Sequence, residues 1–153
     1  MKPLAESMTV AECWQCVGSR GVGRIGFDAG SGPRIHPVDY ISDGSEVRLL
    51  TSETSELARF TRLFAAGGLV TFEVDQLDSS LGERWSVLVA GSVVDARRHG
   101  PDDQTLWPVP TPAGHRDWLV RLRPRQVTGR RLVSSGRAGR DVPIPGGEDP
   151  AGH

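Results

Sequence analysis

The sequence has no long apolar run. Its apolar stretches are short and are interrupted by Gly, Arg or Asp, whereas a membrane-spanning helix needs about 20 apolar residues. The first ten residues also have no apolar core of the kind that a secretory signal peptide carries. We therefore expect no membrane-spanning helix, and by default we expect a cytoplasmic protein.

Cysteine is scarce. The only two cysteines, Cys13 and Cys16, have the C-x-x-C spacing of redox motifs. A reactive pair needs its first cysteine at the start of a helix that follows a buried strand, and no strand is expected before residue 13. There is no second cysteine pair, and the four histidines lack ligand spacing. We interpret the two cysteines as half-buried core thiols and predict no metal site.

The signatures of two common enzyme classes are missing. Ser86 and Ser92 do not stand in the G-x-S-x-G turn of a hydrolase. The glycines of GVGRIG at 21–26 follow an expected helix and open an expected strand, which is the reverse of the order in a dinucleotide-binding loop. Neither a serine hydrolase nor a dinucleotide-binding fold is predicted.

Charge of one sign does not dominate. Eighteen basic residues stand against 19 acidic ones, a net charge of −1, so nothing draws the whole molecule toward nucleic acid. The distribution is uneven, because residues 116–140 hold eight Arg and one acid, whereas residues 43–83 hold eight acids and three Arg. The basic stretch suits either an anion-binding surface or a solvated strand with a basic tail. No RNA-binding signature accompanies it, and we expect no nucleic-acid partner.

Two short helices are expected. Thr9 and Glu12 have the spacing of a capping box, and the apolar positions that follow predict a helix that Gly18 ends. A second helix is predicted from Thr54 to Ala66, ended by the glycines at 67 and 68. The apolar face predicted for this second helix consists of Leu57, Phe60, Leu63 and Phe64.

The remaining patterns predict six strands, over residues 21–30, 34–42, 46–52, 70–75, 84–97 and 118–123. Pro37 indicates an edge or a bulge, Asp43-Gly44 a two-residue hairpin turn of the primed kind, and Gly91 a bulge or a barrel bend. Six antiparallel strands with short helices predict a mainly β protein, a six-stranded antiparallel split or closed β-barrel, because closure removes exposed edges. We expect this single domain over residues 1–133 and a disordered tail, poor in large apolar side chains, over 134–153.

Hydroxyl groups gather before the second helix. Thr51, Ser52, Thr54 and Ser55 lie where the third strand gives way to a helix that begins near Glu56. Hydroxyls and free backbone N–H groups at a helix N-terminus can bind a phosphate or another anion. Simple capping of the helix is the other interpretation.

Six segments occur in an order that is typical of one family. Because these segments follow one another in this order, the chain resembles the pyridoxamine 5′-phosphate oxidase-like family of FMN-binding split β-barrels. It resembles the small single-domain form of the family that is common in actinobacteria. The resemblance covers about residues 9–132. The segments are AECWQCVGSRGVGRIGF (11–27), PRIHPVDYISDG (33–44), VRLLTSETSEL (47–57), VTFEVDQLD (70–78), RWSVLVAGSV (84–93) and VTGRRL (127–132).

The resemblance implies a homodimeric flavoprotein with FMN at the subunit interface, a flavin-dependent oxidoreductase acting on a small molecule. It implies no particular catalytic acid or base. The cofactor-binding positions that it implies are Pro37 and Val38 beside the flavin ring, Thr51, Ser52 and Ser55 at the phosphate, and Trp85 and Ser86 completing the pocket.

The chain departs from the family pattern at three positions. Leu50 and Glu56 stand where family members usually carry Arg and Lys beside the phosphate, and Ala90 stands where Arg is common. Related barrels bind FMN, a deazaflavin, haem or no cofactor. The alternative hypothesis is therefore a flavin-free split barrel that binds another ligand or a partner.

Overall fold

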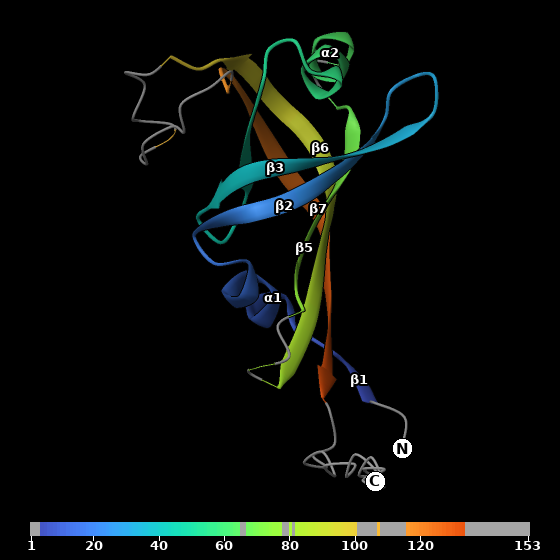
Figure 1. The fold of residues 1–153 in the computed structure, drawn as a ribbon, viewed down its shortest axis with the longest axis vertical. Helices are drawn as coiled ribbons and strands as arrows, with labels where there is room; N and C mark the ends of the chain where they lie inside the picture. Colours follow the sequence, from blue (N-terminus) through green and yellow to red (C-terminus); the bar gives the residue numbers. More distant parts are fainter. Residues whose placement is uncertain are drawn as a thin grey trace, which may run out of the picture.

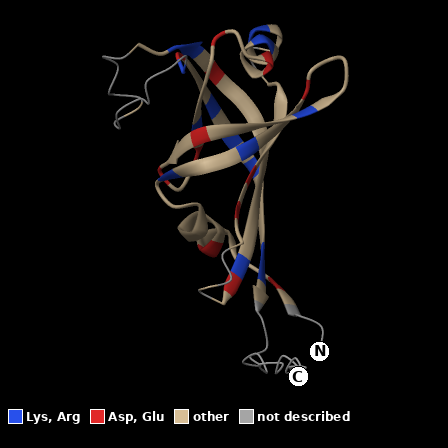
Figure 2. Cartoon of the chain, in the orientation of Figure 1, with Lys and Arg blue, Asp and Glu red and all other residues tan. Residues whose placement is uncertain are grey.

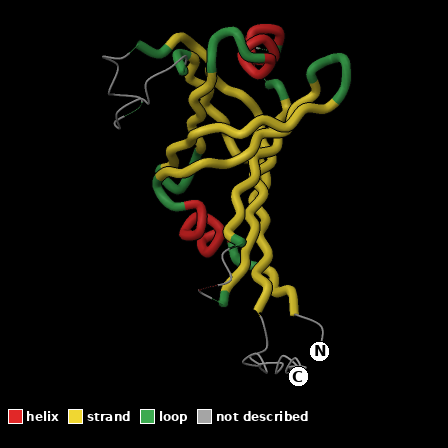
Figure 3. Tube along the Cα trace, viewed as in Figure 1, coloured by secondary structure: helices red, strands yellow, loops and turns green. Residues whose placement is uncertain are grey.

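The computed structural model describes residues 4–64, 67–77, 80, 82–100, 107 and 116–133, and the expected tail over 134–153 lies outside them. Among the described residues, no helix combines the length and the apolar character needed to cross a membrane. Strands make up most of the described chain, with one helix toward either end of the barrel (Figures 1 and 3). The elements are β1 (Leu4–Ser7), α1 (Val10–Val17), β2 (Arg20–Asp28), β3 (Pro33–Ser42), β4 (Val47–Thr51), α2 (Glu56–Leu63), β5 (Leu69–Gln76), β6 (Glu83–Arg98) and β7 (Trp118–Val133).

The sheet closes on itself as an antiparallel barrel. Its strand order is β1-β7-β4-β3-β2-β5-β6, and β6 pairs again with β7. Six strands, β2 to β7, therefore form the closed barrel, and the predicted fold class is confirmed. The hairpin of β6 and β7 continues beyond the barrel as a long arm (Figure 1).

Strand β1 is a seventh strand that the sequence patterns do not predict. It pairs with the end of β7, from Leu4 opposite Val133 to Ser7 opposite Arg130. Four residues are too few for apolar alternation to show. The same pairing helps extend β7 to Val133, well past the end predicted at residue 123.

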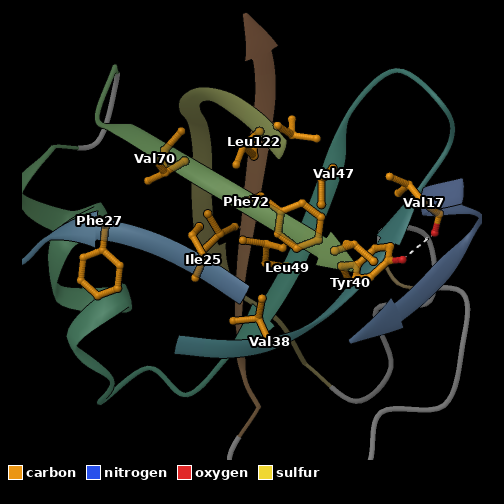
Figure 4. Close-up of a cluster of buried hydrophobic side chains, with 14 of the residues drawn as sticks. Val17, Ile25, Phe27, Val38, Tyr40, Val47, Leu49, Val70, Phe72 and Leu122 are labelled. Atoms are coloured by element: carbon orange, nitrogen blue, oxygen red, sulfur yellow. Dashed lines mark hydrogen bonds between the residues drawn. The ribbon is translucent and has the colours of Figure 1, made fainter. Parts of the chain in front are cut away.

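The barrel interior is apolar. Figure 4 shows side chains from several strands meeting there. Tyr40 is a buried side chain with a polar group, and its hydroxyl donates a hydrogen bond of 2.5 Å to the carbonyl oxygen of Val17, at the end of α1. Burial raises the pKa of this phenol. Among the residues that are fully or almost fully buried are Ile25, Val47, Leu49, Phe72, Val87, Val89 and Leu122.

Helix α1 begins with the predicted capping box. The hydroxyl of Thr9 accepts from the backbone N–H of Glu12 at 3.2 Å, and the Glu12 carboxylate accepts from the N–H of Thr9 at 2.8 Å. Both cysteines are free thiols, Cys13 buried and Cys16 partly buried. Burial raises the pKa of the Cys13 thiol, which keeps it protonated and unreactive. The interpretation of the pair as core thiols is confirmed.

The β6–β7 hairpin has a bulge next to Gly91, as the sequence predicted. Ala90 is opposite Gln126, but Gly91 is opposite Pro124, so β7 has one extra residue at this point. A Cβ atom on Gly91 would clash with the carbonyl oxygen of Arg123. Glycine is required here by close backbone approach.

Two local predictions are wrong. Strands β3 and β4 are joined by residues 43–46, not by a two-residue turn. The Asp43 carboxylate accepts from the N–H groups of Ser45 and Glu46, at 2.9 and 3.1 Å, and so provides the turn from a side chain. Helix α2 is also shorter than predicted, because Phe64 already has the non-helical conformation of a C-cap. Leu63 and Phe64, which were predicted to lie on the apolar face of this helix, are both exposed, whereas Leu57 and Phe60 are buried.

Candidate functional site

Strands β3 and β4 separate on one side of the barrel. Strand β3 pairs with β2 along almost its whole length, but it pairs with β4 only from Asp39, opposite Leu50, to Ser42. The backbone of residues 33–38 therefore has no strand partner on the side that faces β4. Pro37 lies in this free segment, so the prediction of an edge position is confirmed. Thr51 follows Leu50, at the point where the two strands part.

The hydroxyl groups of the β4–α2 junction bond to one another. The Thr51 hydroxyl donates to Ser55 Oγ at 3.0 Å, and the same Oγ accepts from the backbone N–H of Ala58 at 3.0 Å. Ser52 Oγ lies 2.9 Å from Thr54 Oγ1. Ser55 is the N-cap of α2, so the capping interpretation is confirmed for this residue, and the anion-binding interpretation stays a prediction.

Charged groups from distant parts of the chain hold residues 52–55, the loop of the β4–α2 junction, in position. Arg98 forms an ion pair with the Glu53 carboxylate at 3.0 Å. Arg62 donates to the Glu53 carbonyl oxygen at 2.8 Å, and the N–H of Glu53 donates to Asp117 at 2.8 Å. Figure 2 shows the acidic and basic segments together on α2 and on the chain that leads into it. Sequence reasoning missed these residues because their partners are far away along the chain.

The guanidinium of Arg62 is held in place from two sides. It lies 4.4 Å from the centre of the Trp118 ring, and the Trp118 indole N–H donates to the Thr61 hydroxyl at 2.9 Å. The cation–π contact and the bond to Glu53 together position α2 against the start of β7.

One ion pair joins the free segment of β3 to α2. Arg34 Nε lies 3.0 Å from Glu56 Oε2. The other nitrogens of Arg34 donate to the Pro33 carbonyl oxygen at 3.1 Å and to Ser31 Oγ at 3.0 Å. Sequence reasoning singled out Glu56 but not Arg34, because no local pattern links the two positions.

The two predicted ring-side residues differ in exposure. Val38 is a core residue with 4% of its surface exposed, and Pro37 is exposed. Near the junction, Val38 can offer only its backbone, whereas Pro37 can offer a ring surface. Both lie just beyond the last pairing of β3 with β4, where Thr51 begins the hydroxyl-rich junction. The predicted ring-side residues and the predicted phosphate-side residues therefore lie in the same region.

Trp85 and Ser86 lie elsewhere in the chain. They are at the start of β6, opposite Arg131 and Arg130. The Trp85 indole N–H donates to Gln76 at 3.1 Å, and Ser86 lines a hollow of about 600 Å³ beside Met8, Leu88 and Gly129. Arg98 and Trp118, which contact the junction loop and α2, pair at the opposite end of the same hairpin. One chain alone does not bring Trp85 and Ser86 to the junction.

Leu50 does not belong to the junction surface. Only 1% of it is exposed, in a small cluster with Ile41, Leu119 and Trp107. An arginine at this position would bury its charge, which costs free energy unless the charge is paired. Among the described residues, no three or more His, Cys, Asp or Glu side chains lie together in a way that could hold a metal ion.

A closed six-stranded antiparallel barrel in which one strand leaves its neighbour beside a helix is a split β-barrel. Comparison with known families agrees with this class. Residues 9–131 match the model of the pyridoxamine 5′-phosphate oxidase family, and the chain belongs to that family.

Individual relatives are similar over most of their length. The uncharacterized protein Rv0080 of Mycobacterium tuberculosis is 31% identical over 130 residues, 82% of this chain and 84% of the relative. The structure of an FAD-binding protein from Mycobacterium smegmatis is 28% identical, with a TM-score of 0.60 over 84% of this chain and 99% of that one. An FAD-binding protein from Mesorhizobium loti is 18% identical, with a TM-score of 0.61 over 87% and 100% of the two chains, and this similarity concerns the fold.

The residues at the junction fit a flavin nucleotide. The free backbone of β3 offers N–H and C=O groups to a polar ring edge. The hydroxyls of Thr51, Ser52 and Ser55 and the first turn of α2 suit a phosphate. The guanidinium of Arg34 reaches this turn and is a candidate for a cation beside the phosphate. The Glu56 carboxylate carries a charge that opposes a phosphate at this position.

Proposed function

We propose that the protein binds a flavin nucleotide, FMN or FAD, at the β3 edge and the β4–α2 junction, and acts as a flavin-dependent oxidoreductase on a small molecule. The observation that carries the proposal is the free backbone segment 33–38 beside a hydroxyl-rich helix start. Membership of the family and the 28% identity to an FAD-binding protein support it.

Each part of the site has a distinct role in this proposal. The backbone of β3 and the ring of Pro37 orient the flavin, while Thr51, Ser52 and Ser55 hold its phosphate. A bound flavin supplies the hydride or electron chemistry. The protein residues bind and orient the reactants and exclude water. No described residue is assigned the role of catalytic acid or base.

The site is completed by a second copy of the chain in this proposal. Because Trp85 and Ser86 lie at the far end of the β6–β7 hairpin from the junction contacts, the partner subunit would supply them. Exposed apolar side chains support an interface, since such surface is usually covered in an assembly. They include Ile35, Leu69 and Leu88, with exposed fractions of 72%, 63% and 45%.

A titration tests the binding site. FMN and FAD are added to wild-type protein and to Ser52→Ala, and flavin fluorescence is followed. Losing one hydroxyl donor should weaken binding about three- to tenfold. The control is Ser45→Ala, an exposed serine in the 43–46 loop, which should bind as wild type does. Equal weakening in both variants would contradict the assignment of the junction.

Co-expression tests the shared site. Ser52→Asp introduces a carboxylate at the junction, and Trp85→Ala removes the other predicted wall, so each variant alone should bind flavin poorly. In a mixed dimer one site carries both changes and the other carries neither. With random pairing about a quarter of all sites should recover wild-type affinity. No recovery in a sample shown to contain mixed dimers would exclude a site built from two subunits.

A second candidate is a flavin-free barrel that binds another ligand or a partner. The Glu56 carboxylate beside the junction favours it, because this carboxylate already occupies Arg34. Purified protein that shows no absorbance near 450 nm and does not quench added FMN or FAD would support this candidate over the first.

A further inference from the structure

The Arg34–Glu56 ion pair bridges the two parts of the proposed flavin site, and the inference drawn from it rests on the proposed function. Arg34 comes from the free segment of β3 and Glu56 from the first turn of α2. Both side chains reach solvent, with exposed fractions of 36% and 51%. A ligand that spans the β3 edge and the α2 N-terminus must therefore meet this pair.

The two partners are held very differently. Arg34 has acceptors besides Glu56, namely the Pro33 carbonyl oxygen and Ser31 Oγ, and both belong to residues within three positions of it in the chain. Glu56 has Arg34 as its partner, and its remaining support is the favourable electrostatics of a carboxylate in the first turn of a helix. If Glu56 were displaced, the Arg34 guanidinium would stay in place and become available to another anion.

Carboxylates and phosphates use the same guanidinium hydrogen bonds. The Glu56 carboxylate thus occupies a position that a phosphate oxygen of a ligand would take. A phosphate arriving at the junction has to compete with Glu56 for Arg34 and then remain close to the displaced carboxylate. The cost of that repulsion grows with the negative charge on the phosphate.

We infer that Glu56 is a selectivity residue, an internal competitor for Arg34 that disfavours a terminal phosphate monoester relative to a phosphate that is part of a diphosphate bridge. The monoester of FMN carries about −1.5 to −2 charges at neutral pH. In FAD the same phosphate is joined to the ribityl chain by an ester bond and to the AMP phosphate by an anhydride bond. It carries one negative charge itself, and the second charge lies on the more distant AMP phosphate. The wild-type site therefore favours FAD over FMN more than a neutral residue at position 56 would allow.

Removing the carboxylate isolates this effect. Glu56→Gln keeps the size and polarity of the side chain and leaves Arg34 its hydrogen bonds to the Pro33 carbonyl oxygen and to Ser31 Oγ. We expect FMN to bind roughly ten times more tightly than to wild type, FAD roughly three times more tightly, and riboflavin, which has no phosphate, as before. Arg34→Gln should weaken FMN and FAD and leave riboflavin unchanged.

The experiment titrates riboflavin, FMN and FAD separately into wild type, Glu56→Gln and Arg34→Gln at fixed ionic strength, with quenching of flavin fluorescence as the readout. Asp95→Asn is the matched control, because it also removes one acidic charge from an exposed ion pair, that with Arg97 at 3.5 Å. This control should leave the ratio of FMN to FAD affinity unchanged. Thermal melts of each variant check that the fold is intact.

The outcomes separate the inference from the proposed function. A FMN-to-FAD affinity ratio that rises about threefold in Glu56→Gln and stays constant in Asp95→Asn supports the inference. If the flavins bind and Glu56→Gln leaves that ratio unchanged, or tightens riboflavin equally, the inference is overturned and the proposed function stands. If none of the three flavins binds any variant, both are overturned.

Discussion

The wall of the barrel formed by β2, β5, β6 and β7 is built differently from the side where β3 leaves β4. In the wall, pairing is continuous between β5 and β6 and along the β6–β7 hairpin, and its inward side chains are fully buried, as Phe72 illustrates. On the side where β3 leaves β4, called the split below, hydroxyl groups and the Arg34–Glu56 ion pair lie at the start of α2. At the other end of α2, Phe64 is 52% exposed. The wall therefore provides stability, and the split leaves polar groups available for a ligand.

The largest effect that this comparison predicts is on stability. Phe72→Ala should lower the free energy of unfolding by about 3–5 kcal/mol, because it opens a cavity in the wall. Phe64→Ala, at the exposed end of α2, should cost less than about 1 kcal/mol. Chemical denaturation of both variants measures the difference. Similar losses in the two variants would show that the two sides do not differ in packing.

The bulge offers a second test of the wall. Gly91→Ala should destabilise the protein by about 2–3 kcal/mol, because the added methyl group meets the carbonyl oxygen of Arg123 and the backbone must move. At Gly26 the nearest atom to an added Cβ is 3.7 Å away, so Gly26→Ala should change stability by less than about 0.5 kcal/mol. If denaturant midpoints shift equally, close backbone approach does not explain Gly91.

The two helix caps separate stability from binding. Thr9→Ala and Ser55→Ala should each cost about 1 kcal/mol in thermal or chemical unfolding, since each removes an N-cap hydroxyl. Only Ser55→Ala should also weaken FMN binding, because Ser55 lies at the proposed phosphate position and Thr9 lies on α1. An equal loss of flavin affinity in Thr9→Ala would indicate that binding follows overall stability and not the junction.

The smallest effect concerns pH and the 43–46 turn. Donors from Ser45, chiefly its hydroxyl, lower the pKa of Asp43 from its ordinary value near 3.8. A lowered pKa in the folded state means that the carboxylate adds stability above about pH 4 and that this contribution disappears as pH falls through the lowered value. Asp43→Asn should therefore melt a few degrees below wild type at pH 6, and the gap should close toward pH 3. A constant gap would contradict this account.

The wall could be predicted from the sequence. At the split, the edge position of Pro37 and the hydroxyl groups at the start of α2 could be predicted, but the ion pairs could not. The alternation of apolar residues over 70–75 indicates a strand with one buried face, and Gly91 within a strand pattern indicates a bulge. The barrel and its bulge could therefore be predicted. The contacts of Arg34 with Glu56 and of Glu53 with Asp117 join segments that no local pattern relates. Leu50 illustrates the same limit, because its burial under Trp107 depends on a tertiary contact.

Short elements were the other source of error. Strand β1 has too few residues for a period to show, and the Asp43 turn depends on a side chain accepting two N–H groups. The seven cofactor-binding positions came from the family resemblance. In the structure, Pro37 and Val38 lie on the segment of β3 that parts from β4 just before Thr51, whereas Trp85 and Ser86 lie at the other end of the β6–β7 hairpin from Arg98 and Trp118. Only the proposed dimer would assign Trp85 and Ser86 to the same site.

Sedimentation velocity in the presence of FAD, recorded both at a protein wavelength and near 450 nm, tests the central claim most directly. If the flavin site lies at the split and is completed by a second copy, the flavin absorbance should sediment with the protein, in a particle of twice the 16.5 kDa chain mass. Flavin that stays behind while the protein sediments as a 16.5 kDa monomer would contradict the account.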